Sequence, residues 1–330
     1  MLGTAASVPT AARGTSATLI ARGGRRLLID CGEGTQRQLL RSGLGLVDVD
    51  AIFLTHLHAD HYLGLPGLLK TYGLRGRERP LPIVGPRGLG DLLGRLRPVV
   101  GRTAFPLEVE HTDGGTVWED EAVRVEAFPT RHSVPSVGFA LIEEPRPGAF
   151  DVETARSLGV PEGPLFGVLQ RGGEVDLADG GRVRAEQVTG PARAGRRVVV
   201  AGDTEPCDTT AIVADGASVL VHEATFQDAE RERARDTSHS TAAEAGALAR
   251  RAGVDLLVLT HLSPRCAPSE LRREAEAEFP RVHVPRDFDQ VEIPFPERSE
   301  PIVHPARDGR VARADPAGAE ATATVVTHDL

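Results

Sequence analysis

Histidines are concentrated in one short stretch of this chain. Residues 55–61 have the sequence Thr-His-Leu-His-Ala-Asp-His, which places three imidazoles and a carboxylate within six positions. The stretch directly follows the apolar residues 51–54, which are typical of a short buried strand. The alternative, a polar loop with ordinary histidines, requires three of the 11 histidines of the chain to gather here without a role. The pattern therefore predicts a metal site at the end of a strand.

The spacing within this stretch separates the candidate ligands into two pairs. His56 and His58 lie two residues apart, so both side chains can face one metal ion as the chain leaves the strand. Asp60 and His61 follow one turn later and can face a second ion. Neutral imidazoles together with a carboxylate suit zinc, with manganese or iron as less favoured alternatives.

Composition indicates a soluble globular protein in a reducing compartment. The chain has 330 residues, of which 40% are hydrophobic and 26% are charged. No apolar run reaches the ~18 residues of a membrane-spanning helix, and residues 1–5 lack the pattern of a signal peptide. Cys31, Cys207 and Cys266 are an odd number at wide spacings, which does not predict a disulfide framework and fits the cytoplasm.

The net charge of −9 does not by itself indicate a nucleic-acid partner. Proteins that bind nucleic acids usually present a basic surface. Any RNA binding therefore requires positive charge that is concentrated locally.

Predicted strands and helices alternate along most of the chain, which favours an α/β sandwich over an all-α or all-β fold. The predicted strands span residues 16–21, 26–30, 51–54, 82–85, 122–128, 138–142, 198–201, 217–222 and 256–260. The predicted helices span residues 35–40, 64–70, 89–96, 241–252 and 268–279. Thr241 and Glu244 have the spacing of a capping box at the start of one of these helices.

Two segments lack this alternation. Residues 143–197 are rich in glycine, proline and charge, and a segment of this length is either a functional protrusion or disordered. A variable surface insertion is the plainer alternative. Residues 297–330 have little apolar content, so we expect a mostly disordered tail. Residues 1–296, with the protrusion included, are expected to form one domain.

Further candidate ligands follow predicted strands elsewhere in the chain. His132, Asp203 and His261 each come directly or shortly after the end of a strand, where an α/β scaffold presents functional groups. Together with residues 55–61 they can converge on two metal ions. Such ions lie about 3.5–4 Å apart and need a shared ligand, which a carboxylate such as Asp203 can supply.

One more histidine competes for a ligand role. His222 and Glu223 end the strand that begins near residue 217. A histidine buried beside a carboxylate is better explained as a structural histidine than as a ligand.

The order and context of these residues resemble the metallo-β-lactamase fold. More narrowly, several motifs resemble ribonuclease Z, the family of transfer-RNA 3′-processing endonucleases. The motifs are Leu2-Gly3-Thr4 with Pro9-Thr10, Asp30-Cys31-Gly32-Glu33-Gly34-Thr35-Gln36-Arg37-Gln38, His222-Glu223-Ala224-Thr225, His239-Ser240-Thr241, and the run from Gly148 to Phe166. The resemblance covers about residues 2–296, and the motifs that begin with His222 and His239 are its specific part.

By position, the resemblance implies two zinc ions per chain. The implied ligands, three for each ion and one bridge, are His56, His58 and His132, then Asp60, His61 and His261, and finally Asp203. The resemblance also implies that Asp60 accepts the proton of the attacking water, and that Glu223 and His239 assist protonation of the leaving 3′ oxygen.

The resemblance further implies the architecture. We expect a metallo-β-lactamase-type αββα sandwich whose catalytic domain spans residues 1–296. Residues 143–197 are then a protruding arm that clamps the body of transfer RNA. A homodimer is implied by the family alone.

The sequence therefore favours a zinc-dependent endoribonuclease that cleaves the 3′ trailer from precursor transfer RNA, leaving a 3′-hydroxyl on the transfer RNA and a 5′-phosphate on the trailer. A first alternative is a phosphodiesterase of the same fold with a small or non-tRNA substrate, because acidic residues are at least as frequent as basic ones in residues 143–197. A second alternative is a non-catalytic, metal-containing RNA-binding protein. Such a protein has no evident need for a complete ligand set together with Glu223 and His239.

Overall fold

The computed structural model describes residues 1–46, 48–307, 310 and 323–325. The chain divides into two compact units. Met1–Ile142 and Arg196–Leu330 form the first unit, here called the body, and Glu143–Gly195 form the second, here called the arm unit. None of the described helices is long and apolar enough to cross a membrane.

The body is built around two β-sheets. One sheet has the strand order β16-β15-β17-β1-β2-β3-β4-β5, and the other has the order β14-β13-β12-β11-β8-β7-β6. The strands of the first sheet are β1 (Thr18–Arg22), β2 (Arg25–Ile29), β3 (Ala51–Phe53), β4 (Leu81–Gly85), β5 (Leu107–His111), β15 (Gln290–Ile293), β16 (Ile302–His304) and β17 (Ala323–Val325). The strands of the second sheet are β6 (Gly115–Glu119), β7 (Val123–Pro129), β8 (Val137–Glu143), β11 (Arg197–Val200), β12 (Val219–Glu223), β13 (Leu257–Thr260) and β14 (Val282–His283).

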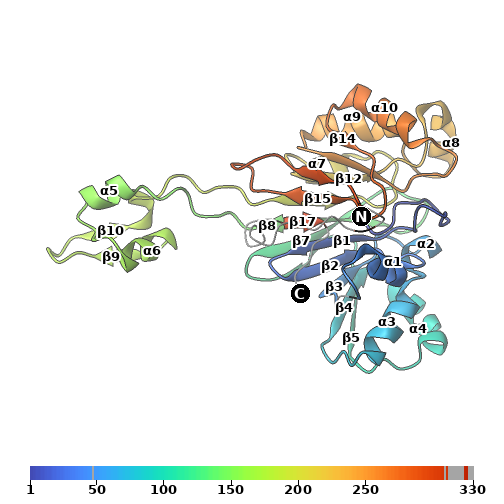
Figure 1. Ribbon diagram of the computed structural model, residues 1–330, viewed down its shortest axis with the longest axis horizontal. Coiled ribbons are helices and arrows are strands. Elements are labelled where there is room, and N and C mark those ends of the chain that lie inside the picture. The colour runs from blue at the N-terminus through green and yellow to red at the C-terminus, as the bar shows by residue number, and fades with distance from the viewer. Residues whose placement is uncertain (47, 308–309, 311–322, 326–330) are drawn as a thin grey trace. The chain divides into compact units, whose positions relative to one another are not determined.

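Helices cover the outer side of each sheet, as Figure 1 shows. On the side of the first sheet lie α1 (Thr35–Ser42), α2 (Ala59–Tyr62), α3 (Leu65–Leu74) and α4 (Leu89–Val100). On the side of the second sheet lie α7 (Asp208–Val213), the short turn η2 (Asp228–Glu230), α8 (Arg231–Asp236), α9 (Ala242–Ala252) and α10 (Pro268–Glu278). The predicted αββα sandwich is therefore confirmed.

In several strands, the apolar side chains on the two faces pack in two different hydrophobic cores. In β3, Ala51 and Phe53 pack in the core between the two sheets, whereas Ile52 packs in the core beneath α1, α3 and α4. In β11, Val198 and Val200 belong to the central core and Val199 to the core beneath α7, α9 and α10. Side chains alternate between the two faces of a strand, so a strand buried on both faces is an unbroken apolar run.

Parallel strands bring several polar side chains to one edge of each sheet. β2, β3 and β4 are parallel neighbours in the first sheet, and β11, β12 and β13 are parallel neighbours in the second. The carboxyl ends of such strands meet at the same edge. Residues 55–61 follow β3, Asp203 follows β11, and His261 follows β13. Glu223 is the last residue of β12.

Most of the predicted elements are confirmed to within a few residues. In α9, the Thr241 hydroxyl accepts a hydrogen bond from the Glu244 N–H at 3.2 Å, and the Glu244 carboxylate accepts one from the Thr241 N–H at 3.0 Å. This is the predicted capping box. Strands β5, β6, β14 and β15 and helices α7 and α8 were not predicted. β5 leaves four of its five residues exposed, so no apolar run marks it in the sequence.

The predicted disordered tail is wrong for two short segments. Residues 302–304 form β16, which pairs with β15. Residues 323–325 form β17, which lies between β15 and β1 and pairs with both. The rest of the predicted tail beyond residue 307, apart from residue 310, lies outside the described residues.

The arm unit has its own small core. It contains α5 (Val152–Ser157), α6 (Pro164–Gln170), β9 (Glu174–Asp176), β10 (Arg182–Arg184) and the turn η1 (Ala185–Gln187). The buried side chains of this core are Ala155, Val160, Leu169, Val175, Val183 and Val188. Most of these residues stand singly among polar residues or glycine, so the sequence shows no periodic pattern. Because the segment has helices, strands and a core of its own, the prediction of disorder is wrong.

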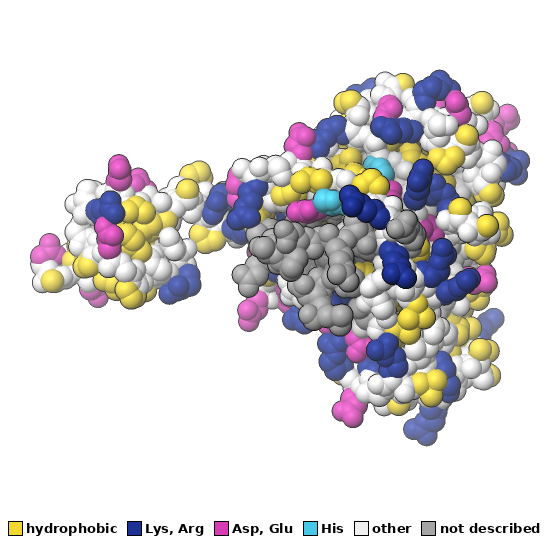
Figure 2. Space-filling view, in the orientation of Figure 1, with side chains coloured by type: hydrophobic (Ala, Val, Ile, Leu, Met, Phe, Trp, Pro, Cys, Tyr) yellow, Lys and Arg dark blue, Asp and Glu magenta, His cyan; other side chains and the backbone are white. Residues whose placement is uncertain are grey.

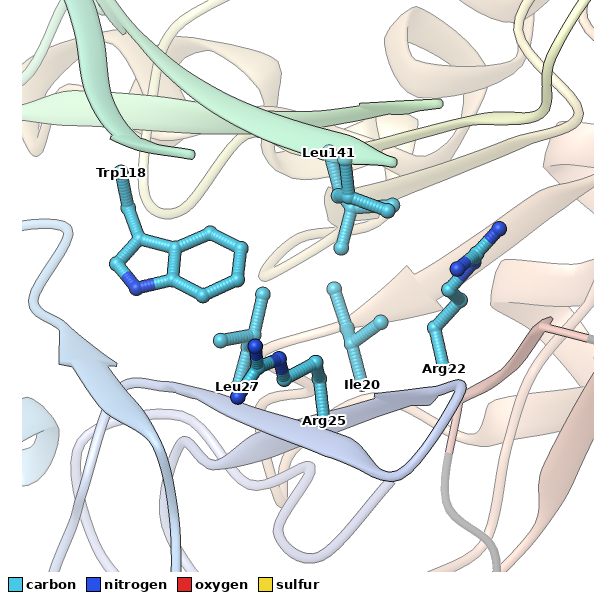
Figure 3. A pocket seen from close by; sticks show the side chains of 7 residues that line it. Ile20, Arg22, Arg25, Leu27, Trp118 and Leu141 are labelled. Carbon is cyan, nitrogen blue, oxygen red and sulfur yellow. The ribbon is translucent and has the colours of Figure 1, made fainter. Parts of the chain in front are cut away.

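A small cavity interrupts the central core at one end of the sandwich. Figure 3 shows Trp118 and Leu141 approaching it from one sheet and Ile20 and Leu27 from the other. The enclosed space amounts to only about 10 Å³, so the two sheets pack closely around it. Trp118 is the single tryptophan of the chain, so its fluorescence reports on the packing of this core.

The central core depends on an aromatic contact across the two sheets. Phe53 of β3 is fully buried, and its ring centroid lies 5.2 Å from that of Phe139 of β8. We predict that Phe53→Ala lowers the free energy of unfolding by about 3–5 kcal/mol, because it removes buried surface and leaves a cavity. Urea denaturation followed by Trp118 fluorescence measures this change. Leu74→Ala is the control, since Leu74 is 78% exposed and its truncation is expected to cost less than about 0.5 kcal/mol. Equal effects would contradict the central role of the contact.

Candidate metal centre

Three histidines from two loops turn ring nitrogens toward one point. His56 Nε2 lies 3.0 Å from His58 Nδ1, and His132 Nε2 lies 3.2 Å from the same Nδ1 atom. Two ligands that each lie about 2.0–2.1 Å from a tetrahedral zinc are about 3.3 Å apart. The spacing of the three nitrogens therefore fits one metal ion. The loop after β3 supplies His56 and His58, and the loop after β7 supplies His132.

A second group of ligand atoms lies next to the first. His261 Nε2 is 3.3 Å from Asp60 Oδ2, and His61 Nε2 is 3.5 Å from the same oxygen. His61 Nε2 is completely buried and has no hydrogen-bond partner among the residues that the structure describes. A buried polar atom without a partner needs an explanation. A metal ion held by His61, Asp60 and His261 provides one.

The carboxylate of Asp203 lies between the two groups. Its Oδ2 atom is 3.7 Å from His56 Nε2, 3.5 Å from His61 Nε2 and 3.1 Å from His261 Nε2. One oxygen atom thus faces a histidine of the first group and two of the second. This is the position that the sequence predicts for a bridging ligand.

Three of the candidate ligand histidines are held by a hydrogen bond at the ring nitrogen that faces away from the site. His61 Nδ1–H donates to Asp30 Oδ2 at 2.8 Å, and His132 Nδ1–H donates to the backbone carbonyl of Ser238 at 2.8 Å. His261 Nδ1–H donates to the Thr225 hydroxyl at 2.8 Å. These bonds fix the tautomer that leaves a lone pair on Nε2, the atom that faces the site.

The Thr225 hydroxyl connects the candidate ligand His261 to the pair Glu223 and His239. It donates at 2.7 Å to Glu223, whose carboxylate is fully buried. Glu223 also accepts a hydrogen bond from His239 Nδ1–H at 2.6 Å. Burial alone would lower the pKa of His239, but the Glu223 carboxylate raises it to about 9. His239 therefore carries a proton at neutral pH, on a ring that stacks against His261 with centroids 5.3 Å apart.

The electrostatics of the centre favour a cation. Burial lowers the pKa of His61, but Asp203 and Asp30 outweigh it and raise that pKa well above its usual range. Burial raises the pKa of Asp203, but His261, His61 and His56 outweigh it and hold that pKa well below its usual range. The buried carboxylates thus require positive charge beside them. A divalent cation meets the same requirement, so the donor set and its charge both fit a metal.

All nine residues predicted for the site are brought together. The seven candidate ligands and the pair Glu223 and His239 occur in groups whose ligand atoms lie within 4.8 Å of one another. His222 belongs to none of these groups. It is fully buried, and its Nδ1–H donates to the Glu223 carbonyl at 2.8 Å. This placement supports the structural role that we expected for it.

Sequence reasoning missed the residues that orient the ligands. Asp30 follows the apolar residues 27–29 of β2 just as Asp203 follows β11, so the same argument could have found it. Thr225 lies in the motif that begins with His222, but its hydroxyl contact to His261 has no local signal. The carbonyl of Ser238 is a backbone group, which no side-chain pattern can indicate.

Comparisons with known proteins agree with this geometry. A sequence profile of the metallo-beta-lactamase superfamily matches residues 10–168. Ribonuclease Z of Natronomonas pharaonis is 48% identical over 301 residues, which cover 90% of this chain and 97% of that protein. Ribonuclease Z of Myxococcus xanthus is 47% identical over 298 residues, which cover 89% of this chain and 97% of that protein. This chain belongs to the ribonuclease Z family.

Solved structures place this ribonuclease Z family member in the same fold. Human tRNase Z, short form, aligns with a TM-score of 0.63 at 29% identity, over 87% of this chain and 95% of that chain. The metallo-beta-lactamase fold protein YhfI of Bacillus subtilis aligns with a TM-score of 0.63 at 21% identity, over 87% and 94%, and shows the fold alone. The superfamily is metal-dependent, in agreement with the groups of His and Asp side chains described above.

In this ribonuclease Z family member, the position of the Asp203 carboxylate depends on the glycine that precedes it. Gly202 has a φ of 68°, and a Cβ atom added to it would lie 2.7 Å from Thr55 Cβ. A side chain here must push Asp203 away from the centre. We predict that Gly202→Ala lowers the metal content and the activity.

Gly216→Ala provides the matched control for this substitution. Gly216 has a φ of 60° with no atom within 4 Å of an added Cβ, so the alanine there meets backbone strain alone. Metal content by elemental analysis and thermal unfolding compare the two variants. A Gly202→Ala protein with full metal content would contradict the assigned contact.

Proposed function

We propose that this chain is a zinc-dependent endoribonuclease that removes the 3′ trailer from precursor transfer RNA. Cleavage leaves a 3′-hydroxyl on the transfer RNA and a 5′-phosphate on the trailer. The observation that supports this most directly is the convergence of seven metal-ligand candidates with the Glu223–His239 pair in a member of the ribonuclease Z family.

Two zinc ions per chain are part of the proposal. His56, His58 and His132 would hold one, and Asp60, His61 and His261 would hold the other. Asp203, whose carboxylate faces both groups, would serve both. When bound, zinc would neutralise charge on the phosphate and lower the pKa of water to near 7. A set of imidazole and carboxylate ligands favours zinc over magnesium or calcium.

The side chains of the centre then move two protons. The oxygen of the attacking water forms a bond to phosphorus, and Asp60 accepts the proton that this water loses. Burial raises the pKa of Asp60, but its hydrogen bond with His261 and the charges of His61 and His261 lower it. Asp60 is therefore ionised and free to accept.

The leaving group receives the second proton. As the bond from phosphorus to the 3′ oxygen breaks, His239 donates its proton to that oxygen and a 3′-hydroxyl results. Glu223 holds the imidazolium in place through the 2.6 Å hydrogen bond at Nδ1, so that Nε2 carries the proton that is donated. A raised pKa near 9 keeps the acid form present at neutral pH and removes it above that value.

The arm unit is proposed to bind the body of the transfer RNA. A folded transfer RNA is larger than the metal centre, so a remote contact adds binding energy for this substrate alone. The arm unit carries acidic and basic side chains side by side, as Figure 2 shows. Arg182 is paired with Glu174 at 2.9 Å and with Asp176 at 2.6 Å, and Arg156 is paired with Glu162 at 2.6 Å. Arg171 is exposed and has no ion pair within the described residues.

The proposal includes a homodimer located in the cytoplasm. The cytoplasm is inferred from Cys31, Cys207 and Cys266, which are free thiols, as expected in a reducing compartment. The homodimer follows from membership of the family.

The test of the proposed function compares two substrates. The protein is incubated with a 3′-extended precursor transfer RNA and, separately, with bis(p-nitrophenyl) phosphate, each with and without a chelator. We expect both to be cleaved, both activities to be lost with chelator, and the new termini to be 3′-hydroxyl and 5′-phosphate. Asp60→Ala and Asp203→Ala should abolish both activities while the fold remains. Cleavage of the small ester alone would favour the phosphodiesterase, for which the ion-paired arginines of the arm unit are the supporting observation.

We predict about two zinc ions per active chain, as a dinuclear centre requires. His58→Ala should empty the first position, and His261→Ala should weaken the second. Elemental analysis of the purified protein measures both. His304→Ala is the control, because His304 is paired with Glu292 at 2.8 Å and belongs to none of the ligand groups. One zinc or none in fully active protein would exclude the dinuclear centre.

We predict that deletion of residues 146–184 raises KM for precursor transfer RNA far more than it changes cleavage of bis(p-nitrophenyl) phosphate. All candidate ligands lie in the body, so the metal centre can form without the arm unit. Arg171→Ala should weaken transfer-RNA binding and lower its salt dependence, since the salt slope falls by about 1 for every phosphate that the protein no longer neutralises.

Arg182→Ala is the matched control for Arg171→Ala, because its guanidinium is already neutralised by two carboxylates. Equal losses on both substrates after the deletion would mean that the arm unit supports the fold of the centre. No loss on either would mean that it is a surface insertion.

A further inference from the structure

The second metal position is contacted by a segment that contributes no ligand to it. The backbone N–H of Ser7 donates a hydrogen bond of 2.9 Å to Asp60 Oδ2. Apart from the imidazole of His261, it is the one hydrogen-bond donor to this carboxylate in the described part of the chain. When the His261 nitrogen is committed to a metal ion, Ser7 is the donor that remains.

The direction of this N–H is set by an unusual turn. Ser7 has a φ of 60°, and the Val8 N–H donates to the Ala6 carbonyl at 2.6 Å. This is a γ-turn with positive φ, which is rare and strained. The neighbouring N–H groups are used elsewhere, because Ala5 donates to Gly14 and Ala6 donates to Leu262. The turn therefore leaves the Ser7 N–H directed at Asp60 alone.

The same segment also holds the second histidine of this position. The Leu262 N–H donates to the Thr4 carbonyl at 2.9 Å, and the Ala6 N–H donates to the Leu262 carbonyl at 3.1 Å. Leu262 directly follows His261, whose own φ is 53°. The left-handed conformation of His261 is thus fixed on its carboxyl side by pairing with residues 4–6.

The segment is itself anchored firmly. The Thr4 hydroxyl donates to Asp287 Oδ1 at 2.8 Å, and the Gly14 N–H donates to Asp287 Oδ2 at 2.6 Å. Thr4, Ala5 and Ala6 are buried, whereas Ser7 is exposed. An anchored segment thus ends in a turn that extends to the metal centre. None of the hydrogen bonds described for residues 4–7 reaches His56, His58 or His132.

Strain of this kind is concentrated around the centre. Among the described residues, five that are not glycine have a positive φ, namely Ser7, Asp30, Ser238, His261 and Phe288. Asp30 orients His61, Ser238 orients His132, and His261 is itself a candidate ligand. Such conformations persist only where the surroundings enforce them, and they gather at functional sites. Ser7 is the member of this group that contacts Asp60 through its backbone N–H.

We propose that Ser7 is a positioning residue for the second metal, acting through its backbone N–H on Asp60, and that it has no part in the first. This inference rests on the proposed dinuclear centre. The Ser7 hydroxyl plays no role in it.

Four substitutions at one position separate the backbone from the side chain. Ser7→Pro removes the N–H and cannot adopt a positive φ. Ser7→Val keeps the N–H but places a β-branched residue where positive φ is strongly disfavoured. Ser7→Ala keeps both the N–H and the turn, and Ser7→Gly keeps the N–H and relieves the strain. Val8→Ala is the neighbouring control, since Val8 is 55% exposed and its N–H still closes the turn.

The readout is metal binding rather than activity. Zinc is titrated into chelated protein in competition with a chromophoric chelator, and cobalt absorption spectra are recorded in parallel to follow the two positions. For Ser7→Pro we expect the affinity of the second ion to fall about 10–100-fold, the range for loss of a group that orients a ligand. The affinity of the first ion should be unchanged. Ser7→Val should weaken the second step to a smaller extent, while Ser7→Ala, Ser7→Gly and Val8→Ala should bind as the wild type does.

Several outcomes would overturn the inference without touching the proposed function. Wild-type affinity for both ions in Ser7→Pro would do so. Equal loss of both ions would also do so, because it would show a general structural role. If Ser7→Pro fails to fold, an unchanged second step in Ser7→Val has the same meaning. A wild-type protein that binds only one ion would instead count against the dinuclear centre itself.

Discussion

The buried carboxylate of Asp203 is the constraint on which the rest of the centre depends. Its Oδ2 atom lies within 3.7 Å of ring nitrogens from His56, His61 and His261. His56 belongs to the first ligand group, and the other two belong to the second. A carboxylate in the interior is costly unless positive charge or hydrogen bonds compensate it. The surrounding imidazoles supply that charge only if they are protonated or if a cation lies among them. The carboxyl ends of strands from both sheets must therefore meet beside Asp203. His56 and His61 follow β3 of the first sheet, whereas Asp203 and His261 follow β11 and β13 of the second.

The loops that carry the ligands are held by backbone conformations that cost free energy. A residue other than glycine in the left-handed region costs about 1–3 kcal/mol, and four such residues surround the centre. Hydrogen bonds of 2.8 Å from His61 to Asp30 and from His132 to the Ser238 carbonyl compensate part of this cost. At Ser7 and Ser238 this conformation has a structural consequence, because it directs a backbone N–H or carbonyl inward that a regular strand would have used for pairing. Loops held in this way lose less conformational entropy when a ligand binds.

The sequence identifies the side chains that converge on the centre but not the groups that orient them, and the reason is physical. His56, Asp203 and His261 follow apolar runs that can only be buried strands, so their place at the sheet edge follows from the pattern. The contacts of Ser7, Thr225 and Ser238 join segments that are far apart in the chain or use backbone atoms, and neither leaves a periodic signal. The same holds for β17, which pairs with β1 across about 300 residues of chain. The arm unit was predicted as a protrusion from the resemblance, but its internal core leaves no periodic pattern, because most of its buried side chains stand singly among polar residues or glycine.

The net charge of this protein is −9, so it does not attract RNA as a whole. The groups that bind the RNA and the groups that cleave it must therefore be considered separately. The metal centre supplies positive charge where the scissile phosphate lies, but its field reaches only about 8–10 Å at physiological salt. Contacts farther along the transfer RNA must come from unpaired arginines. In the arm unit, Arg156 and Arg182 are neutralised by neighbouring carboxylates, which leaves Arg171 exposed for this purpose. A binding surface of this kind gains little affinity from long-range attraction. Under the proposed function, the arm unit would discriminate by shape, because a small ester gains nothing from a second contact that a whole transfer RNA can make.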